Sequence, residues 1–372
     1  MKIGLARRGY SSTGGAENYL RRLAVALTAA GHEPTLLADP TWPPDQRPAG
    51  VGFVAVPGRS PRAFAQALAP ASAAAGCDRL FSLERVWRCD CYRAGDGVHQ
   101  AWLERRRRAE PWWQHLLRPF NRKHVQLLAL ERQLFAGGGA ARIIANSELV
   151  RREIIAHYGT PAGRIRVVYN GLPAESFTPV SDAERAAARA DLGLTYQDYA
   201  ILFAGTGWGR KGFAHVLRAV GQLSDETVPT LLAAGRDDPG PYWSRSTDLA
   251  RDRTRFVGPT KNMRALYAAA DVFVAPTLYD PFSNACLEAL AAGLPVLTTG
   301  ANGFAEIIEP GVHGEIFDVA DGATGEALAA LLTAWADPDR RAAARPLCAA
   351  KARTFTIEKN VAETLAVLLP EG

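Results

Sequence analysis

The chain carries the same pattern of strand, glycine-rich loop and helix twice, once at its start and again from residue 199. In the first copy the apolar run Lys2 to Ala6 precedes the loop RRGYSSTGG and a helix with apolar positions 16, 20, 23, 27 and 30. In the second copy Tyr199 to Ala204 precedes GTGWGRKG and a helix whose apolar face holds Phe213, Val216, Leu217, Val220 and Leu223. Apolar residues three or four apart mark one face of a helix, and alternating strands and helices favour a parallel sheet. The repeat therefore predicts two doubly wound α/β domains.

The join between the domains is predicted where NGLPAESFTP, from Asn170 to Pro179, breaks both periodicities with glycine and two prolines. A chain of 372 residues is also too long for one typical hydrophobic core. We expect an N-terminal domain over 1–172, a C-terminal domain over 173–355, and a helix over 356–372 that packs back on the first domain. In such a protein the default binding site is the crevice at the carboxyl ends of the two sheets.

The composition is that of an ordinary folded protein, with 48% apolar and 22% charged residues. No apolar run is long enough to cross a membrane, and the start MKIGLA lacks the features of a signal peptide. The five cysteines have no C-x-x-C spacing, which favours reduced thiols in the cytoplasm. No Asp-x-Asp follows a predicted strand.

The second glycine-rich loop, Gly207-Trp-Gly209-Arg-Lys-Gly212, matches the dinucleotide pattern G-x-G-x-x-G. Arg210 and Lys211 stand where a helix N-terminus alone usually holds a pyrophosphate, and cations are unfavourable at that end of a helix. The two cations favour a diphosphate that gains charge as it leaves, although they can also be read as solvating a helix start. An NAD-dependent oxidoreductase is the alternative, but Asp237 follows Gly207 by 30 residues, whereas the ribose acid is expected after about 20.

A carboxylate stands in an otherwise apolar predicted helix within DPFSNACLEALAAGLPVLTT, residues 280 to 299. Glu288 is surrounded by Ala285, Leu287, Ala289 and Leu290, so the helix has almost no face that suits it. Asp280 precedes it by eight residues. The block therefore points to a buried acid with a function.

This block resembles the acidic-x7-Glu signature of the family-4 retaining glycosyltransferases, which have the GT-B fold of two Rossmann-like domains facing each other across a cleft. The resemblance extends to Gly14-Gly15-Ala-Glu17, to Ala145-Asn-Ser-Glu148 and to Asn302-Gly303, and so spans nearly the whole chain. Within the family, GRKG and the loop of CDCYRAGDGVH resemble bacterial enzymes that add glucose to the heptose of the lipopolysaccharide core.

The resemblance implies a role for each matching residue. Arg210 and Lys211 would neutralise the diphosphate, Glu288 would bind the ribose, and Asp280 would bind the transferred sugar. Asp280 stands where the family usually has Glu, and it can also be read as a turn residue before Pro281. Other implied contacts to the nucleotide sugar come from Gly14, Gly15, Gly207, Ser283, Asn284 and Ala285.

A second implied group lies on the acceptor side. Asp96 and His99, in Arg93-Ala-Gly-Asp-Gly-Val-His, follow a predicted strand, and relatives place such residues near the donor sugar or the acceptor hydroxyl. Glu17 is a further candidate for the sugar or the acceptor. Asp-Gly is also a common turn, so a purely structural role for Asp96 stays open.

The excess positive charge is concentrated between Ala101 and Arg132, where basic residues are interleaved with aromatic ones. Such a stretch can lie on an anionic membrane surface or meet an acidic acceptor, and a solvated helix pair is the simpler alternative. No nucleic-acid motif accompanies it, and we expect no nucleic-acid partner. The residues assigned to an anionic surface are Arg105, Arg106, Arg107, Arg108, Trp112, Trp113, Arg122 and Lys123.

The resemblance therefore implies a retaining, metal-independent hexosyltransferase without a cofactor, and no metal site is expected. We expect it to move glucose from UDP-glucose to a lipopolysaccharide-core or other glycolipid or saccharide acceptor. The expected location is cytoplasmic, on the inner face of the membrane through residues 102–132. Besides the oxidoreductase, the alternatives are a GT-B sugar-nucleotide epimerase and a noncatalytic protein that binds anionic surfaces.

Overall fold

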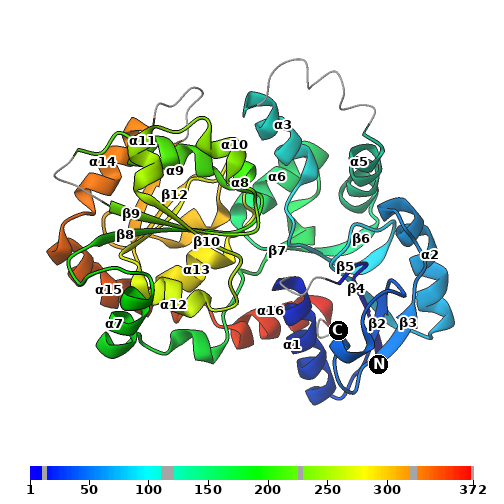
Figure 1. Ribbon diagram of the computed structural model, residues 1–372. Helices are drawn as coiled ribbons and strands as arrows, with labels where there is room; N and C mark the ends of the chain where they lie inside the picture. The colour runs from blue at the N-terminus through cyan, green and yellow to red at the C-terminus, as the bar shows by residue number, and fades with distance from the viewer. Residues whose placement is uncertain (11–14, 110–120, 225–228, 319–324, 370–372) are drawn as a thin grey trace. The chain divides into compact units, whose positions relative to one another are not determined.

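The computed structural model describes residues 1–10, 15–109, 121–224, 229–318 and 325–369. The chain divides into two compact units (Figure 1): unit 1 comprises Met1–Tyr169 with Glu358–Gly372, and unit 2 comprises Asn170–Ile357. Each unit is built on a parallel sheet with helices on both faces, as the repeated pattern predicts. The expected joins at residues 172 and 355 each lie within three residues of the joins between the units.

Unit 1 has a seven-stranded sheet in the order β3-β2-β1-β4-β5-β6-β7 with every neighbouring pair parallel. The order reverses between β1 and β4, which makes the carboxyl ends of these strands a topological switch point. The strands are β1 (Lys2–Ala6), β2 (Glu33–Ala38), β3 (Gly52–Ala55), β4 (Arg79–Ser82), β5 (Cys89–Ala94), β6 (Ala140–Ala145) and β7 (Ile165–Val167).

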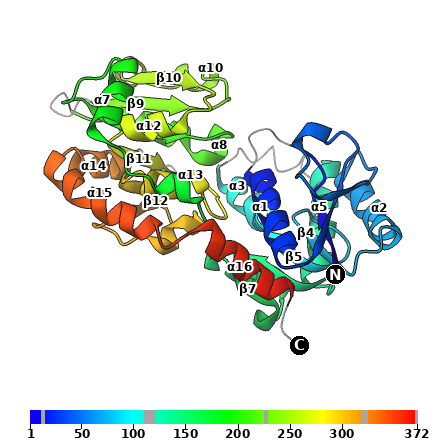
Figure 2. The ribbon, with the colours of Figure 1, turned by 90° about the horizontal axis from the view of Figure 1, so that it is seen from below.

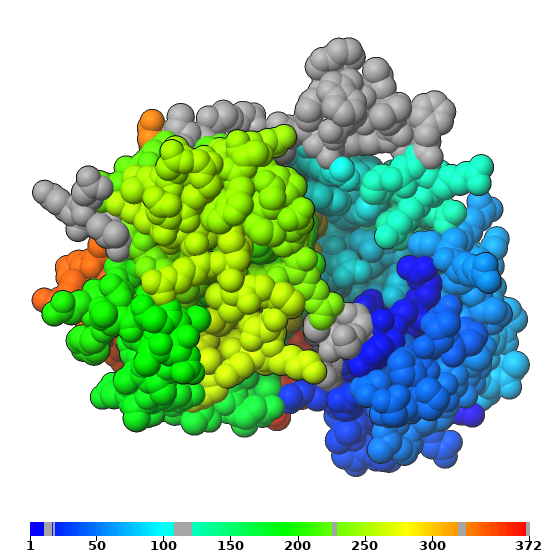
Figure 3. Space-filling model, viewed as in Figure 1, coloured from blue at the N-terminus to red at the C-terminus, as the bar shows by residue number. Residues whose placement is uncertain are grey.

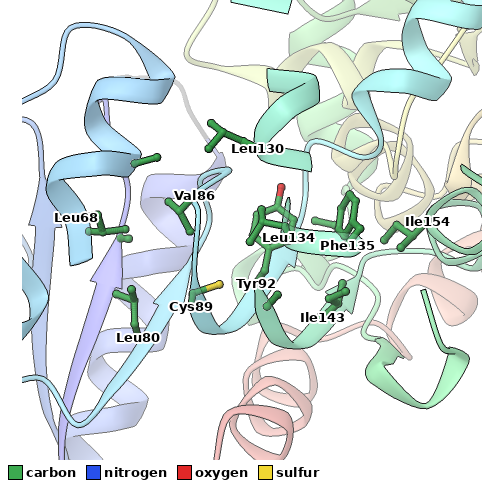
Figure 4. Close-up of a cluster of buried hydrophobic side chains, with 14 of the residues drawn as sticks. Leu68, Leu80, Val86, Cys89, Tyr92, Leu130, Leu134, Phe135, Ile143 and Ile154 are labelled. Atoms are coloured by element: carbon green, nitrogen blue, oxygen red, sulfur yellow. The ribbon is translucent and has the colours of Figure 1, made fainter. Parts of the chain in front are cut away.

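Helices cover both faces of this sheet. On one face α2, α5 and α6 bury a continuous apolar cluster that includes Leu68, Tyr92, Leu134 and Ile154 (Figure 4). On the other face lie α1 and α16 (Figure 2), joined by a 3.0 Å hydrogen bond between the hydroxyls of Tyr19 and Thr364. The helices are α1 (Gly15–Ala29), α2 (Pro61–Ala74), α3 (His99–Ala109), α5 (Arg122–Phe135), α6 (Glu148–Tyr158) and α16 (Ile357–Leu368).

Unit 2 repeats the design with six parallel strands in the order β10-β9-β8-β11-β12-β13. Its switch point lies between β8 and β11, and both strands are fully buried. Strands buried on both faces read as continuous apolar runs, as Tyr199 to Ala204 does. The strands are β8 (Tyr199–Ala204), β9 (Pro229–Ala234), β10 (Thr254–Gly258), β11 (Val272–Ala275), β12 (Val296–Thr299) and β13 (Gly314–Phe317).

The larger helices of unit 2 also form two layers, with α9, α11 and α14 on one face and α7, α12, α13 and α15 on the other (Figure 1). The charged helix α7 lies on the surface seen in Figure 3. The helices are α7 (Asp182–Asp191), α8 (Trp208–Lys211), α9 (Phe213–Val220), α10 (Gly240–Trp243), α11 (Asp248–Asp252), α12 (Met263–Ala269), α13 (Asn284–Ala291), α14 (Glu326–Ala334) and α15 (Pro338–Ala352).

The last helix, α16, belongs to unit 1 although the chain enters it from unit 2. Besides the Tyr19 contact, Asn360 donates a hydrogen bond to the carbonyl of Tyr169, and Arg142 donates to the carbonyl of Val367 at 3.3 Å. These contacts tie the carboxyl-terminal helix to β6 and to the end of the first unit.

Candidate active site

The carboxyl ends of β8 and β11 bring together the two segments of unit 2 that the sequence singles out. The chain leaves β8 through Gly205 to Gly207 and enters α8, whereas it leaves β11 through Pro276 and runs to the start of α13. Ligands of doubly wound folds bind at such a switch point. The site is therefore built from these two connections.

Arg210 and Lys211 lie in the last turn of the short helix α8. The expectation of a loop from Gly205 to Gly212 is wrong for this part, because residues 208–211 are helical and Gly207 and Gly212 act as N-caps of α8 and α9. The two cations lie at the carboxyl end of one helix, where positive charge is favourable, as well as directly before the next.

Gly212 allows α8 and α9 to approach the loop after β11. Its φ is +82°, and a Cβ at this position would lie 1.9 Å from the carbonyl oxygen of Pro276. Only glycine fits such a contact at a positive φ. The approach is fastened by the carbonyl of Arg210, which accepts from the amide of Leu278 at 2.9 Å and from Thr277 Oγ1 at 3.1 Å.

The central contact is an ion pair between Lys211 Nζ and Asp280 Oδ2. Arg210 Nη1 donates to the carbonyl of Tyr279 at 2.7 Å and lies 3.8 Å from the same Asp280 oxygen. The Asp280 side chain is 9% exposed, so two cations meet one buried carboxylate and leave one positive charge in excess. Such a site favours an anionic ligand such as a diphosphate.

The amides at the start of α8 are occupied by a side chain. Asp237, which follows β9, accepts from the amides of Gly207 at 2.9 Å and Trp208 at 2.8 Å. These are the amides that a dinucleotide fold offers to a pyrophosphate. Asp237 therefore caps α8, and the structure assigns it neither the position nor the role of a ribose acid.

The start of α13 is fixed by Asn302. Asn302 Oδ1 accepts from the amide of Ser283 at 3.2 Å, and backbone bonds join Asp280 to Ala301 and Gly303. Ser283 makes no side-chain cap, and first-turn amides such as those of Asn284 and Ala285 have no partner within their own helix.

Glu288 lies on α13, half-buried, and its Oε2 accepts from the Tyr267 hydroxyl at 2.8 Å. Burial raises the pKa of Glu288 above its usual range, and the Tyr267 hydrogen bond partly opposes this. One turn of helix separates Glu288 from the amides of Asn284 and Ala285. The acid that looked misplaced in the sequence is thus held by a tyrosine beside a helix N-terminus.

In unit 1 a second charged cluster lies at the switch point between β1 and β4. Arg7, directly after β1, lies 3.4 Å from Glu17 Oε1 and 3.1 Å from Glu84 Oε1. Burial raises the pKa of Glu84, and Arg7 opposes the shift. Gly14 lies outside the described residues, and Gly15 is the first residue of α1.

Asp96 lies between β5 and α3, whereas His99 is the first residue of α3, and the two have different surroundings. The Asp96 side chain is 67% exposed and lies 3.8 Å from Arg85 Nη1. His99 Nε2 is 2.9 Å from His124 Nδ1, and burial, followed by the charge of Arg85, lowers the pKa of His99 to about 4. A neutral imidazole at pH 7 follows.

Five residues of these clusters were missed from the sequence: Arg7, Glu84, Arg85, Glu131 and Tyr267. Asn302 entered there only as part of the family resemblance, with no role assigned. Glu131 carried a weaker form of the signal that Glu288 gave, because it is an acid in the leucine-rich second half of α5, between Leu130 and Leu134. For the others the sequence offers no spacing signal, because their partners come from distant strands and helices.

The basic stretch is described only in part. Arg107, Arg122 and Lys123 are exposed, Arg106 is half-buried, and Arg105 is paired with the buried Glu153. Trp102 is half-buried. The side chains of Arg108, Trp112 and Trp113 lie outside the described residues.

Within the described ranges, no helix is long and apolar enough to cross a membrane, and no three His, Cys, Asp or Glu side chains gather as metal ligands would. All five cysteines are free thiols, and four of them are buried.

Two parallel α/β units, the second with paired cations at its switch point, define a protein of the GT-B class. Family models agree: residues 13–176 match Glycosyltransferase Family 4, and residues 198–337 match Glycosyl transferases group 1. The chain therefore contains two glycosyltransferase domains, each matched by its own family model.

Curated glycosyltransferases match part of the chain. D-inositol 3-phosphate glycosyltransferase of Corynebacterium kroppenstedtii is 31% identical over 218 residues, which cover 55% of this chain and 48% of that protein. The chain spans about half the length of the first curated relatives it matches.

Solved structures share the fold over almost their whole length. WaaG, a glycosyltransferase involved in lipopolysaccharide biosynthesis, has a TM-score of 0.82 at 21% identity and covers 99% of this chain and 100% of its own. HepE of Anabaena, solved with UDP-glucose, has a TM-score of 0.73 at 18% identity and covers 99% and 100%.

Proposed function

We propose that this glycosyltransferase transfers a hexose, glucose in the first instance, from a UDP-sugar to a saccharide of a glycolipid. The observation that carries the proposal is the meeting of Arg210, Lys211 and Asp280 at the switch point of unit 2. The cations suit the diphosphate of the donor, and the carboxylate suits a sugar hydroxyl. The ribose is assigned to Glu288.

The choice of UDP-glucose is supported by HepE, which shares the fold and was solved with that ligand. It is also consistent with the arrangement around α13, where Glu288 can accept hydrogen bonds from two ribose hydroxyls once a ligand arrives. Asp237 argues against NAD, because it occupies the amides that the pyrophosphate of a dinucleotide needs.

The proposed chemistry is a front-face transfer with retention. As the bond between the sugar and the diphosphate breaks, negative charge grows on the leaving group, and Lys211 and Arg210 stabilise it there. The departing diphosphate helps take the proton of the acceptor hydroxyl, so no protein nucleophile and no metal is assigned. Asp96, exposed beside Arg85, is assigned to the acceptor hydroxyl.

The proposed acceptor is a lipopolysaccharide-core saccharide, supported by the fold shared with WaaG and by the exposed basic residues of α3 and α5. Those residues favour a position at the inner, cytoplasmic face of the membrane, on anionic lipid.

The test is a transfer assay with separate UDP-, GDP- and ADP-glucose donors and a lipopolysaccharide acceptor lacking its outer core. Product formed from UDP-glucose with an α-linkage, read by the anomeric proton signal, supports the proposal. A β-linked product would refute the retaining mechanism. Transfer only from GDP- or ADP-glucose would refute the assignment of a UDP-sugar as the donor. Chelation of divalent ions should leave the rate unchanged.

A further inference from the structure

Glu131, on α5, is the most deeply buried carboxylate among the described residues of unit 1, with no exposed surface. Its Oε1 accepts from Arg85 Nε at 2.8 Å and from the amide of His99 at 2.6 Å. Its Oε2 accepts from the Tyr158 hydroxyl at 2.8 Å and from the amide of Gln100 at 3.3 Å. A buried carboxylate is costly unless it is paired and hydrogen bonded on both oxygens, and this one is.

Three of the donors to Glu131, namely Arg85, His99 and Gln100, lie next to the Asp96 turn. His99 and Gln100 are the first residues of α3, so a side chain of α5 takes the place of an N-cap for that helix. Arg85, held by Glu131, donates from Nη2 to the carbonyl of Gly97 at 2.9 Å and places Nη1 3.8 Å from Asp96. Gly97, His99 and Gln100, which follow the exposed Asp96 in the chain, are thereby tied to one buried acid.

The position of Glu131 is fixed in turn by the core. Leu130 and Leu134 of α5 are fully buried in the apolar cluster of Figure 4, together with Phe135. The Glu131 carboxylate cannot become exposed to solvent unless α5 loses its packing against the core. Glu131 is therefore a rigid point to which the turn is attached, rather than a surface charge that follows it.

We propose that Glu131 is a positioning residue for the acceptor, acting through Arg85 and through the amides of His99 and Gln100 on the Asp96 turn. The inference rests on the proposed function, because it takes Asp96 as the acceptor-side group. A displacement of about 1 Å at a reacting group can lower a rate by about 100-fold. In Glu131→Gln the side chain loses the negative charge that pairs with Arg85. Its NH₂ group is a donor, so it cannot accept the hydrogen bonds that one carboxylate oxygen accepts in the parent.

The experiment compares Glu131→Gln with Glu153→Gln. Glu153 is a matched control, because it is also a buried acid of unit 1 paired with an arginine, and this partner, Arg105, lies nine residues beyond Asp96 in the chain (105 − 96). Both variants are measured for transfer, for stabilisation by UDP and for amide hydrogen exchange of a peptide covering residues 94–101.

Glu131→Gln is expected to lower kcat/KM for the acceptor by about 10- to 100-fold, to leave stabilisation by UDP unchanged and to speed exchange in 94–101. Glu153→Gln should keep the acceptor kcat/KM within about threefold of the parent. Equal losses in both variants, or unchanged exchange and kcat/KM in Glu131→Gln, would overturn the inference.

If Glu131→Gln fails to fold, Arg85→Lys serves as the second variant. It keeps the positive charge near Glu131 but removes the planar fork that reaches Gly97 and Asp96 together. The same selective loss is expected, and wild-type acceptor kinetics in Arg85→Lys would overturn the inference. A parent chain without transfer activity would instead refute the proposed function. In that case, faster amide exchange of residues 94–101 in Glu131→Gln would still show that Glu131 holds the Asp96 turn in place.

Discussion

Lys211 and Asp280 form an ion pair across the switch point of unit 2, joining the end of α8 to the loop after β11. The pair holds the ammonium in place in the absence of a ligand, and Arg210 lies beside it. Pre-positioned charge of this kind needs no rearrangement when a leaving group develops negative charge. The following predictions test the parts of this site.

Removal of the ammonium should reduce the chemical step. Lys211→Ala is expected to lower kcat about 10²- to 10³-fold, the usual cost of one group that stabilises a transition-state oxyanion. Circular dichroism should show an unchanged fold. Lys351→Ala, on α15, is the control and should keep the parental kcat; a Lys211→Ala variant at the parental rate would contradict the assignment.

Neutralising Asp280 should have opposite effects on binding and on transfer. In Asp280→Asn the cations lose their internal partner, so UDP should bind more tightly, whereas transfer should fall about tenfold or more because a sugar contact is lost. Titration calorimetry with UDP measures the first and initial rates the second. Asp280→Glu retains the charge and restores the residue usual in the family, so it should lose less activity; weaker UDP binding in Asp280→Asn would count against the account.

The raised pKa of the half-buried Glu288 predicts a defined pH dependence of stability. An unfolded chain loses this proton near the ordinary pKa of 4.5, while burial raises the pKa of Glu288 in the folded chain. Between the pKa of the unfolded chain and that of the folded chain, only the folded chain keeps this proton. The free energy of unfolding relative to Glu288→Gln should therefore fall as the pH rises through this interval and then level off. The check is the melting temperature of both proteins measured from about pH 4 to about pH 8. A parent that gains stability relative to Glu288→Gln as the pH rises would contradict the prediction.

The cap that Asp237 provides should contribute to stability. Asp237→Ala leaves the amides of Gly207 and Trp208 without their acceptor, and loss of such a cap costs about 1 kcal/mol. Denaturant unfolding monitored by tryptophan fluorescence measures the change. Asp252→Ala, at the exposed end of α11, should change stability far less, and equal effects would remove the capping role.

Membrane binding should depend on the exposed cations and hardly on Arg105. Arg107, Arg122 and Lys123 are exposed, whereas Arg105 is already paired with Glu153. A triple alanine variant of the exposed residues should lose about 1 kcal/mol per charge in binding to vesicles rich in phosphatidylglycerol. Co-sedimentation measures this, with Arg105→Ala as the comparison; binding that ignores the anionic lipid content would refute the electrostatic mechanism.

The fold could be predicted from the sequence because it depends on local patterns. Strands buried on both faces, such as β8, are continuous apolar runs, and α9 shows its apolar face at regular helical spacing. The short helix α8 was missed because two glycines flank it, and its cap, Asp237, comes from another strand.

The candidate site could be predicted only where chemistry conflicts with local structure. Glu288 on an apolar helix and two cations beside a glycine are such conflicts, and both lie at the switch point of unit 2. The network of Arg85 and Glu131 escaped prediction because its members are 46 residues apart and meet only through the packing of α5 on the sheet. Patterns within a short stretch of sequence do not indicate which distant residues will pair.

The central claim, a site for a nucleoside diphosphate at Arg210 and Lys211, is tested most directly by thermal shift with UDP, GDP, ADP and NAD on the parent chain and on Lys211→Ala. The account predicts that UDP raises the melting temperature of the parent, that NAD does not, and that the UDP effect is lost or strongly reduced in Lys211→Ala. Stabilisation by NAD alone, or by UDP equally in both proteins, would contradict it.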